Sequence, residues 1–311
     1  MTTIRPMSTM RMGGYQPERS VHTRGARALA AGLERRLGAA HTIDFMPDIA
    51  ATGRPASDLL ALTETGHLDL CYFASSYLAG RVPELSILDL PFEGGVREQV
   101  WGKLDGAVGN RLKEAVAART GYALLGFWDN GIRHVSNAVR PICTPVDCAG
   151  LGIRTLDNTF HQAIFSALGF KPRFIDVKDL SAAVVSGAID AQENPLTNIV
   201  NFDIHKTHRH ITLLGQFFGI ALLLANRAAV ESWPADVRNA VEEAAAEATS
   251  AQRRFAAEED RQCMALLEAD GVRFVTADEI DLPAFKAAVA PVVARETAQL
   301  PADLIALGRE D

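Results

Sequence analysis

A chain of 311 residues, 48% hydrophobic and 22% charged, is long enough for two compact domains or one large α/β domain. Its net charge of -7 argues against a general nucleic-acid binder, which needs a basic face. The longest apolar run, residues 217–225, is shorter than the ~20 residues of a membrane span, so no stable membrane insertion is expected. The first residues lack the charged segment and apolar core of a secretory signal. This leaves a cytoplasmic protein, or one whose signal was removed or missed at the assigned start.

The first third of the chain alternates between strand and helix patterns. Strands are expected at residues 3–12, 41–46 and 68–73, and helices at 17–38 and 55–65. In the first helix Leu29, Leu33 and Leu37 recur at i+4 spacing, and Gly38 ends it. His22 and Arg24 are assigned to its solvated face, and the alternative is that they face the cleft entrance. This strand–helix order predicts a parallel sheet covered by helices.

The same alternation returns further along the chain and predicts a second α/β unit. Strands are expected at 122–128, 132–136, 151–155, 173–175, 189–192, 211–214 and 220–225, with a turn at 129–131 and helices at 158–168 and 180–186. An apolar stripe predicts a long helix from Pro234 to about Leu267, and residues 283–307 form an amphipathic end that packs on one lobe. The fold class is therefore α/β with two lobes, residues 1–130 with 219–257 and residues 131–218 with 258–311.

Common catalytic and cofactor signatures are absent from the sequence. There is no Gly-x-Gly-x-x-Gly, phosphate-binding loop, Gly-x-Ser-x-Gly or His-Glu-x-x-His, so no cofactor is expected. The four cysteines match no zinc pattern; a Cys143–Cys148 disulfide is conceivable, but free thiols are favoured. The histidines of the segment 205–210 have no acidic or cysteine partner at a known spacing, so no metal site is assigned.

Two arginines stand where open α/β sheets bind their ligands, at the ends of strands. Arg133 lies in an otherwise hydrophobic strand and Arg154 ends another. A guanidinium fork can hold a carboxylate through two parallel hydrogen bonds. The alternative is that each arginine pairs with an acidic neighbour, and the neighbours considered are Asp129, Asp157 and Asp190. Asn194 precedes a proline, so its extended backbone can direct its amide into a cleft or simply form a turn.

In this order and spacing, six short segments resemble the DctP-type solute receptors of TRAP transporters (tripartite ATP-independent periplasmic systems). The resemblance runs from Met12 to about Val293. The segments are Gly66–Leu70, Leu88–Phe92, Asn130–Arg133, Gly152–Arg154, Asp190–Pro195 and Trp233–Val237. It implies a periplasmic-binding-protein (Venus-flytrap) fold whose long helix spans both lobes and whose cleft closes on a small organic acid. It also implies a periplasmic location and transfer of the acid to membrane permease subunits.

The resemblance assigns roles to particular residues. Arg154 aligns with the arginine that grips the ligand carboxylate, Arg133 with an assisting arginine, and Asn194 with an asparagine that orients the ligand. Phe174 corresponds to a hydrophobic contact. The expected first-lobe contacts are Tyr15 at the end of the first strand, together with Phe73, Ser75 and Ser76. Trp128 is more often a core residue, but beside Arg133 it can stack on an organic ligand.

The sequence therefore favours a monomeric binding protein rather than an enzyme, and two other readings stay open. An enzyme acting on a small acid would need a base beside the arginines, and His134 and Glu193 are the nearest in sequence. A ligand-sensing module would share the fold and the site. Turnover of a bound acid would indicate the enzyme, and a neighbouring sensor-kinase gene the sensing module.

Overall fold

The computed structural model describes residues 8–38, 41–93 and 96–309, which form two compact units. Residues up to 74, 113–129 and 221–257 form the first, and residues 75–112, 130–220 and those from 258 onward form the second. The lobes expected from the sequence differ chiefly in placing residues 75–112 in the first, and those lobe boundaries stay a prediction. No helix of the described residues is long and apolar enough to cross a membrane.

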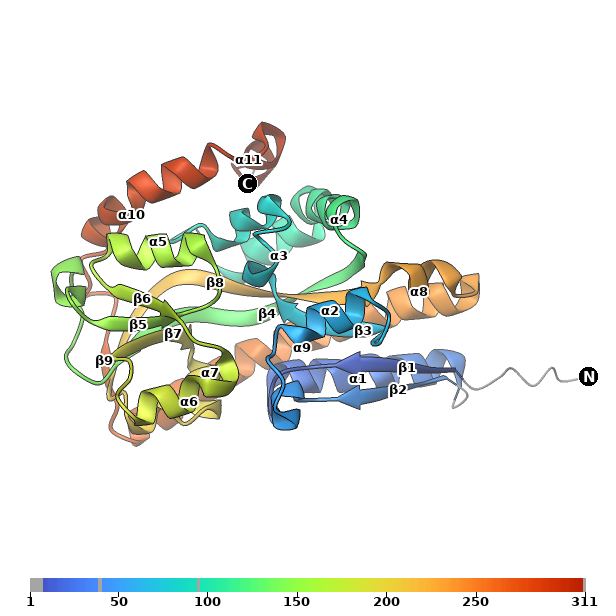
Figure 1. Cartoon of the computed structure of the whole chain (residues 1–311), viewed down its shortest axis with the longest axis horizontal. Coiled ribbons are helices and arrows are strands. Elements are labelled where there is room, and N and C mark those ends of the chain that lie inside the picture. The colour runs from blue at the N-terminus through green and yellow to red at the C-terminus, as the bar shows by residue number, and fades with distance from the viewer. Residues whose placement is uncertain (1–7, 39–40, 94–95, 310–311) are drawn as a thin grey trace, which may run out of the picture. The chain divides into compact units, whose positions relative to one another are not determined.

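The first unit is built on a small, mainly parallel sheet (Figure 1). Its strands are β1 Ser8–Gly13, β2 His41–Met46 and β3 Leu70–Ala74, and its helices are α1 Val21–Leu37, α2 Asp58–Glu64 and α8 Arg227–Ser232, with a 3-10 turn at Ile49–Thr52. Strand β1 pairs in parallel with β2 and β3, and β3 pairs antiparallel with residues 221–225. The expected strand–helix order of this region is confirmed from residue 8 onward, and residues 3–7 of the first expected strand lie outside the described part of the chain.

Helix α1 shows how local chemistry sets an element's ends. The Ser20 hydroxyl accepts the Thr23 backbone N–H at 3.1 Å, which satisfies a donor that the first turn leaves free. Gly38 ends the helix at φ +74°, where its N–H donates to the Glu34 carbonyl. Leu29 and Leu33 are buried, as their spacing predicts. The helix was therefore identifiable from Gly38 and from its apolar face, while its start lies at Val21 rather than near the expected Pro17.

The second unit contains a mixed sheet with helices packed against it. Its own strands are β5 Gly152–Thr155, β6 Lys171–Phe174, β7 Ala191–Pro195 and β9 Arg273–Val275, and its helices are α3 Arg97–Asp105, α5 Thr159–Ala167, α6 Val177–Val185, α7 Leu196–Asn201, α10 Leu282–Thr297 and α11 Ala302–Arg309. Short 3-10 helices are η2 Ser75–Tyr77, η3 Pro83–Asp89, η4 Pro145–Cys148 and η5 Ile204–Lys206. Strand β5 pairs in parallel with β6 and β7, so the carboxyl ends of β5 and β6 lie at one sheet edge.

Two strands are longer than the sequence predicts. Strand β4 runs without a break over Tyr122–Asn137, and β8 over His210–Asn226. The expected turn at 129–131 is wrong: Gly131 takes φ +82° inside β4, which bends the strand without ending it. Gly215 does the same in β8 at φ +59°. In the second unit β4 pairs antiparallel with β7, and this register decides which polar side chains of the two strands meet.

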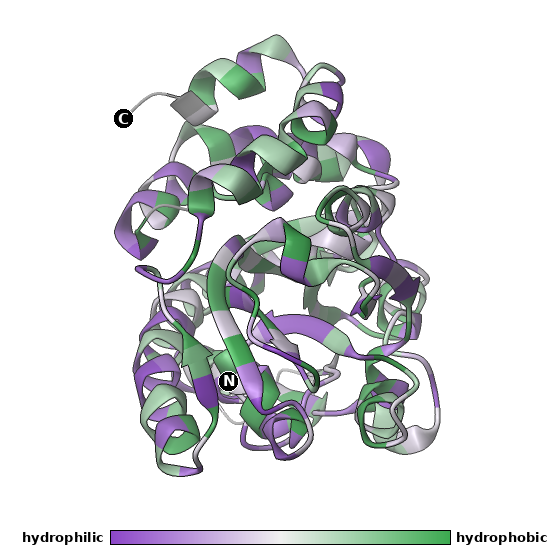
Figure 2. Ribbon diagram, turned by 90° about the vertical axis from the view of Figure 1, so that its left-hand side faces the viewer, coloured by the Kyte–Doolittle hydropathy of each residue, from purple (hydrophilic) through white to green (hydrophobic). Residues whose placement is uncertain are grey.

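The expected long helix is present in the structure. It is α9, which runs over Ala235–Ala269, about 50 Å at 1.5 Å per residue; a shorter helix, α4, covers Ala107–Arg119 earlier in the chain. The expected amphipathic end consists of two helices, α10 and α11, and Pro301 precedes the second. In the second unit Phe285 and Val289 of α10 pack in one apolar cluster with Phe160 and Ile164 of α5. Figure 2 shows hydrophobic and hydrophilic residues alternating along the helices, as one packed face and one solvated face require.

Candidate functional site

Arg154 is the most unusual polar side chain of the second unit. It sits in the short strand β5, and only 1% of it is exposed. Its Nε–H donates to the Ile175 carbonyl at 2.8 Å. Its Nη2 has no hydrogen-bond partner among the described residues, although it is buried. A buried donor without a partner is costly, so this nitrogen is set to bind an acceptor that the chain itself does not supply.

Arg133 differs, because its guanidinium already has a carboxylate partner. Its Nε donates to Glu193 Oε2 at 2.5 Å and its Nη2 to Glu193 Oε1 at 2.8 Å. The same Nη2 also contacts the Glu193 carbonyl at 2.9 Å and Asn194 Oδ1 at 3.3 Å. The side chains of both ion-pair partners are buried, at 4% and 0% exposure. The ion-pair alternative therefore holds for Arg133, and its buried partner is Glu193, which was not among the acidic neighbours considered for it.

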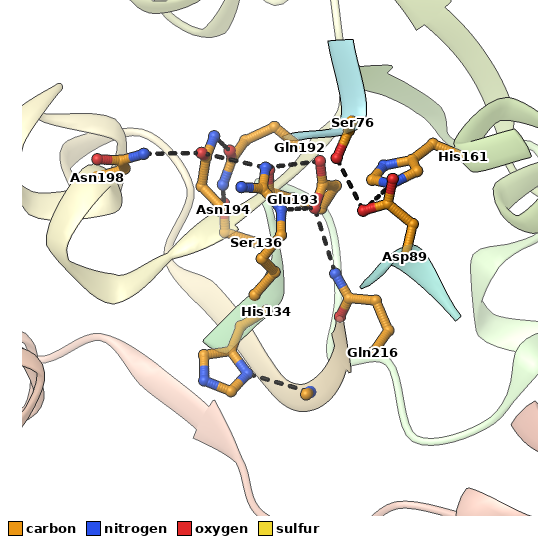
Figure 3. Close-up of polar contacts among 12 residues, drawn as sticks. Ser76, Asp89, His134, Ser136, His161, Gln192, Glu193, Asn194, Asn198 and Gln216 are labelled. Carbon is orange, nitrogen blue, oxygen red and sulfur yellow. Dashed lines mark hydrogen bonds and ion pairs between the residues drawn. The ribbon is translucent and has the colours of Figure 1, made fainter. Parts of the chain in front are cut away.

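Asn194 belongs to a buried network of amides (Figure 3). Its Nδ2 donates to Gln192 Oε1 at 2.5 Å, and its Oδ1 accepts from Asn198 at 3.2 Å. Gln192 in turn donates to the Ser136 hydroxyl, which contacts His208 Nδ1 at 3.1 Å. The chain therefore fixes the direction of the Asn194 amide in advance. The structure brings Arg133 and Asn194 into contact, and the ligand contact assigned to each stays a prediction.

Tyr77 lies among the charges of these arginines. Burial raises the pKa of its hydroxyl, while Arg154 and Arg133 lower it and Asp176 and Glu193 raise it. Two guanidinium groups of the second unit therefore act on one phenol that projects from η2. Sequence patterns did not assign Tyr77 to the site.

The short helix η2 is held in place by buried polar groups. The Ser76 hydroxyl donates to Asp89 Oδ1 at 2.8 Å, and its carbonyl accepts from Asn158 Nδ2 at 2.8 Å. His161 Nε2 lies 3.2 Å from the same Asp89 oxygen, and its ring stacks on Phe217. Figure 3 shows Ser76, Asp89 and His161 turned toward one another. Ser76 is thus tied to structure, while the hydroxyl of neighbouring Ser75 is buried and has no partner among the described groups.

Phe174 is the one predicted site residue that is clearly open to solvent, with 45% exposed. It ends β6 and is in register with Thr155, one residue after Arg154 on the adjacent strand. An exposed aromatic ring is unfavourable in water, so a ligand that covers it gains apolar burial. The structure therefore places Phe174 on the strand beside the arginine that the sequence singled out.

In the first unit the predicted aromatic contacts form one cluster. The rings of Tyr15 and Phe73 lie 4.8 Å apart, and Tyr72 links Tyr15 to Trp128. Trp128 is fully buried, and its Nε1–H donates to Thr249 Oγ1 at 3.1 Å. These contacts are those of a core residue, which is the alternative that the sequence offered for Trp128. Next to Tyr15, Gln16 is buried and its Oε1 has no partner within the described chain, a polar group that sequence patterns did not single out.

His22 is part of the same cluster, which corrects the expectation that it lies on a solvated helix face. It is 2% exposed and stacks on Tyr72 at 5.1 Å. Burial lowers its pKa to about 3, so the ring is neutral at physiological pH. The first helix therefore turns a titratable side chain into the core, while Arg24 lies over the Phe255 ring at 4.0 Å.

We expect this buried histidine to make the protein sensitive to acid. The unfolded chain binds a proton near the ordinary pKa of 6.5, whereas the folded chain resists it down to about 3. The effect of His22 on the free energy of unfolding is therefore absent above pH 6.5. As pH falls toward 3 the free energy of unfolding decreases, by about 3 kcal/mol at pH 4. Urea unfolding measured between pH 7 and 4 should show that the free energy of unfolding falls less with decreasing pH in His22→Phe than in the parent chain. An identical dependence on pH in both proteins would show that His22 is not buried as a neutral ring.

The structure gives no support to a metal site or a disulfide. Among the described residues no group of three or more His, Cys, Asp or Glu side chains could hold a metal ion. His205 Nδ1 contacts the Ile199 carbonyl, and His208 contacts Ser136, so these rings serve local packing. All four cysteines are free, as favoured from their spacing.

Comparison with known proteins assigns the chain to a family. Residues 12–299 match the model described as bacterial extracellular solute-binding protein, family 7. The chain belongs to this family. A solute-binding protein of Verminephrobacter eiseniae (strain EF01-2) is 30% identical and covers 94% of this chain and 86% of its own.

Solved structures extend the match to the fold. A TRAP periplasmic solute binding protein from Polaromonas sp. JS666, bound to D-erythronate, is 26% identical, with a TM-score of 0.91 over 97% of this chain and 98% of its own. Another, from Bordetella bronchispeptica with density assigned to pantoate, is 25% identical, with a TM-score of 0.90 over 97% and 99%. These matches confirm the resemblance read from the sequence and the two-lobed α/β fold of this solute-binding protein.

Proposed function

We propose that the protein is the solute receptor of a TRAP transporter and that it binds a small organic acid through Arg154. One observation carries the proposal: a buried guanidinium whose Nη2 has no partner in the described chain. A ligand carboxylate supplies the missing acceptor through a short charge-assisted bond. The family and the acids in related solute-binding proteins, D-erythronate and pantoate, support the same chemistry.

The other site residues have distinct parts in this proposal. Arg133 is fixed by Glu193 and donates a hydrogen bond to the Asn194 side chain. Its positive charge also lowers the pKa of the Tyr77 hydroxyl. Asn194 presents an amide of fixed direction, which suits recognition of a hydroxyl or carbonyl beside the carboxylate. Phe174 offers apolar contact to the body of the acid. Tyr15, Phe73, Ser75, Ser76 and Trp128 complete the proposed set, with Trp128 acting as support for the aromatic cluster.

Transport rather than catalysis is the function that these contacts favour. Both bases that an enzyme would use already have other contacts. Glu193 is bound on both oxygens by Arg133, and His134 Nδ1 accepts the Gly215 N–H at 3.2 Å. Burial lowers the pKa of His134 to about 4, which makes it a weak base at neutral pH. The receptor would act in the periplasm as a monomer and pass the acid to its permease subunits.

A thermal-shift screen against hydroxy acids, sugar acids, dicarboxylic acids and amino acids tests the proposal. An acid at 100 times its Kd adds about 2.7 kcal/mol to the free energy of unfolding, which corresponds to several degrees in Tm. We expect at least one organic acid to give such a shift, and mass spectrometry to recover that acid unchanged. Uncharged analogues, such as the methyl esters, serve as matched controls. Chemical conversion of the acid would contradict the receptor role.

A further inference from the structure

Four charged groups of the second unit act on the Tyr77 hydroxyl. Its hydroxyl is influenced by the guanidinium groups of Arg154 and Arg133 and by the carboxylates of Asp176 and Glu193. All four groups belong to the second unit. Two positive and two negative charges leave no excess positive charge to receive a doubly charged ligand.

The two guanidinium groups differ in the groups that already bind them. Glu193 meets Arg133 with both carboxylate oxygens inside the protein, so the charge of Arg133 is compensated where it lies. Arg154, by contrast, has a neutral carbonyl as its recorded partner, and its buried Nη2 is unsatisfied within the described residues. Arg154 therefore offers a ligand carboxylate an unsatisfied donor, whereas Arg133 already has the carboxylate of Glu193 as its partner.

Other charged groups of the second unit also disfavour a second ligand carboxylate. Asp176 follows Ile175, whose carbonyl holds Arg154, and its carboxylate caps α6 by accepting the Lys178 N–H at 3.0 Å. A second ligand carboxylate would add to this negative charge. Arg173 is in register with Arg154 on β6, but it is exposed, so water and salt screen it.

We propose that the ligand is a monocarboxylate with a neutral polar body, and that dicarboxylates of the same size are discriminated against. This inference rests on the proposed function, because it assumes that Arg154 holds the acid. Its physical reason is that a carboxylate removed from water without a partner is strongly disfavoured, whereas a hydroxyl or amide at the same place needs only ordinary hydrogen bonds.

Calorimetry with matched ligand pairs tests the inference on the unaltered protein. The pairs differ only in the second carboxylate: D-erythronate with meso-tartrate, galactonate with galactarate, and succinamate with succinate. In every pair with measurable binding we expect the monocarboxylate to bind at least about tenfold more tightly, the equivalent of one unpaired charge partly screened by solvent. Equal or tighter binding of the dicarboxylate overturns the inference. Failure of all acids to bind overturns the proposed function itself.

Two variants probe the charge balance directly. Glu193→Gln removes the compensation of Arg133, so the preference for the monocarboxylate should shrink at least severalfold. Circular dichroism tests whether this variant is folded. If it is unfolded, the ligand pairs measured on the unaltered protein decide the question. Arg173→Gln is the control, and the preference should be unchanged. A preference that grows in Arg173→Gln would show that the exposed arginine receives a second carboxylate, which contradicts the inference.

Discussion

Replacing Arg154 by alanine is expected to reduce the affinity for the organic acid by at least about 100-fold. A charge-assisted hydrogen bond from a buried guanidinium contributes about 1.5–3 kcal/mol, and its removal also leaves the ligand carboxylate without its cation; about 1.4 kcal/mol is a factor of ten. Arg154→Lys should also weaken binding, by at least about tenfold, because an ammonium lacks the planar fork that matches a carboxylate. Calorimetry with the acid identified by the thermal screen measures both effects.

Arg173 provides a matched control for this substitution. It is in register with Arg154 on the adjacent strand, but its side chain is exposed. Arg173→Ala removes the same charge from nearly the same place, and the affinity should change by less than about threefold, since exposed charges are screened. If Arg154→Ala binds as tightly as the parent chain, or if both variants lose affinity equally, Arg154 is not the carboxylate anchor.

The importance of Arg154 was accessible from sequence because it depends on local order. A strand ending in an arginine, inside a chain that alternates strands and helices, places that side chain at a sheet edge where ligands bind. The structure adds that Arg154 is buried and that Nη2 lacks a partner in the described residues. Neither fact follows from a pattern of residue types, because both depend on what surrounds the strand.

The partner of Arg133 was not accessible in the same way. Glu193 lies 60 residues away, and the two meet because β4 continues past Gly131 and pairs antiparallel with β7. Reading Asp129-Asn130-Gly131 as a turn hid this pairing and favoured acidic residues nearby in sequence. His22 was misplaced for a related reason: its burial depends on Tyr72 and Trp128, which come from two other strands. Long-range packing decided both cases.

The buried Arg133–Glu193 pair leads to the second large expected effect. Arg133→Met should lower the free energy of unfolding by about 3–5 kcal/mol, because it leaves the Glu193 carboxylate fully buried without its cation. Gln216, whose Nε2 is 3.5 Å from Glu193 Oε2, is too distant to replace two charged bonds. Urea unfolding monitored by circular dichroism measures the loss as a lower midpoint at constant slope.

The double variant Arg133→Met/Glu193→Leu separates the cost of an unpaired charge from the net contribution of the pair. Replacing a buried ion pair by apolar side chains of similar volume is often nearly neutral, so the double variant should recover most of the stability that Arg133→Met loses. Arg54→Met, which breaks the exposed pair with Asp58, is the control and should have little effect. A double variant less stable than Arg133→Met would mean that the pair itself stabilises the fold. In that case the Asn194 network, and not only the charge balance, would depend on Arg133.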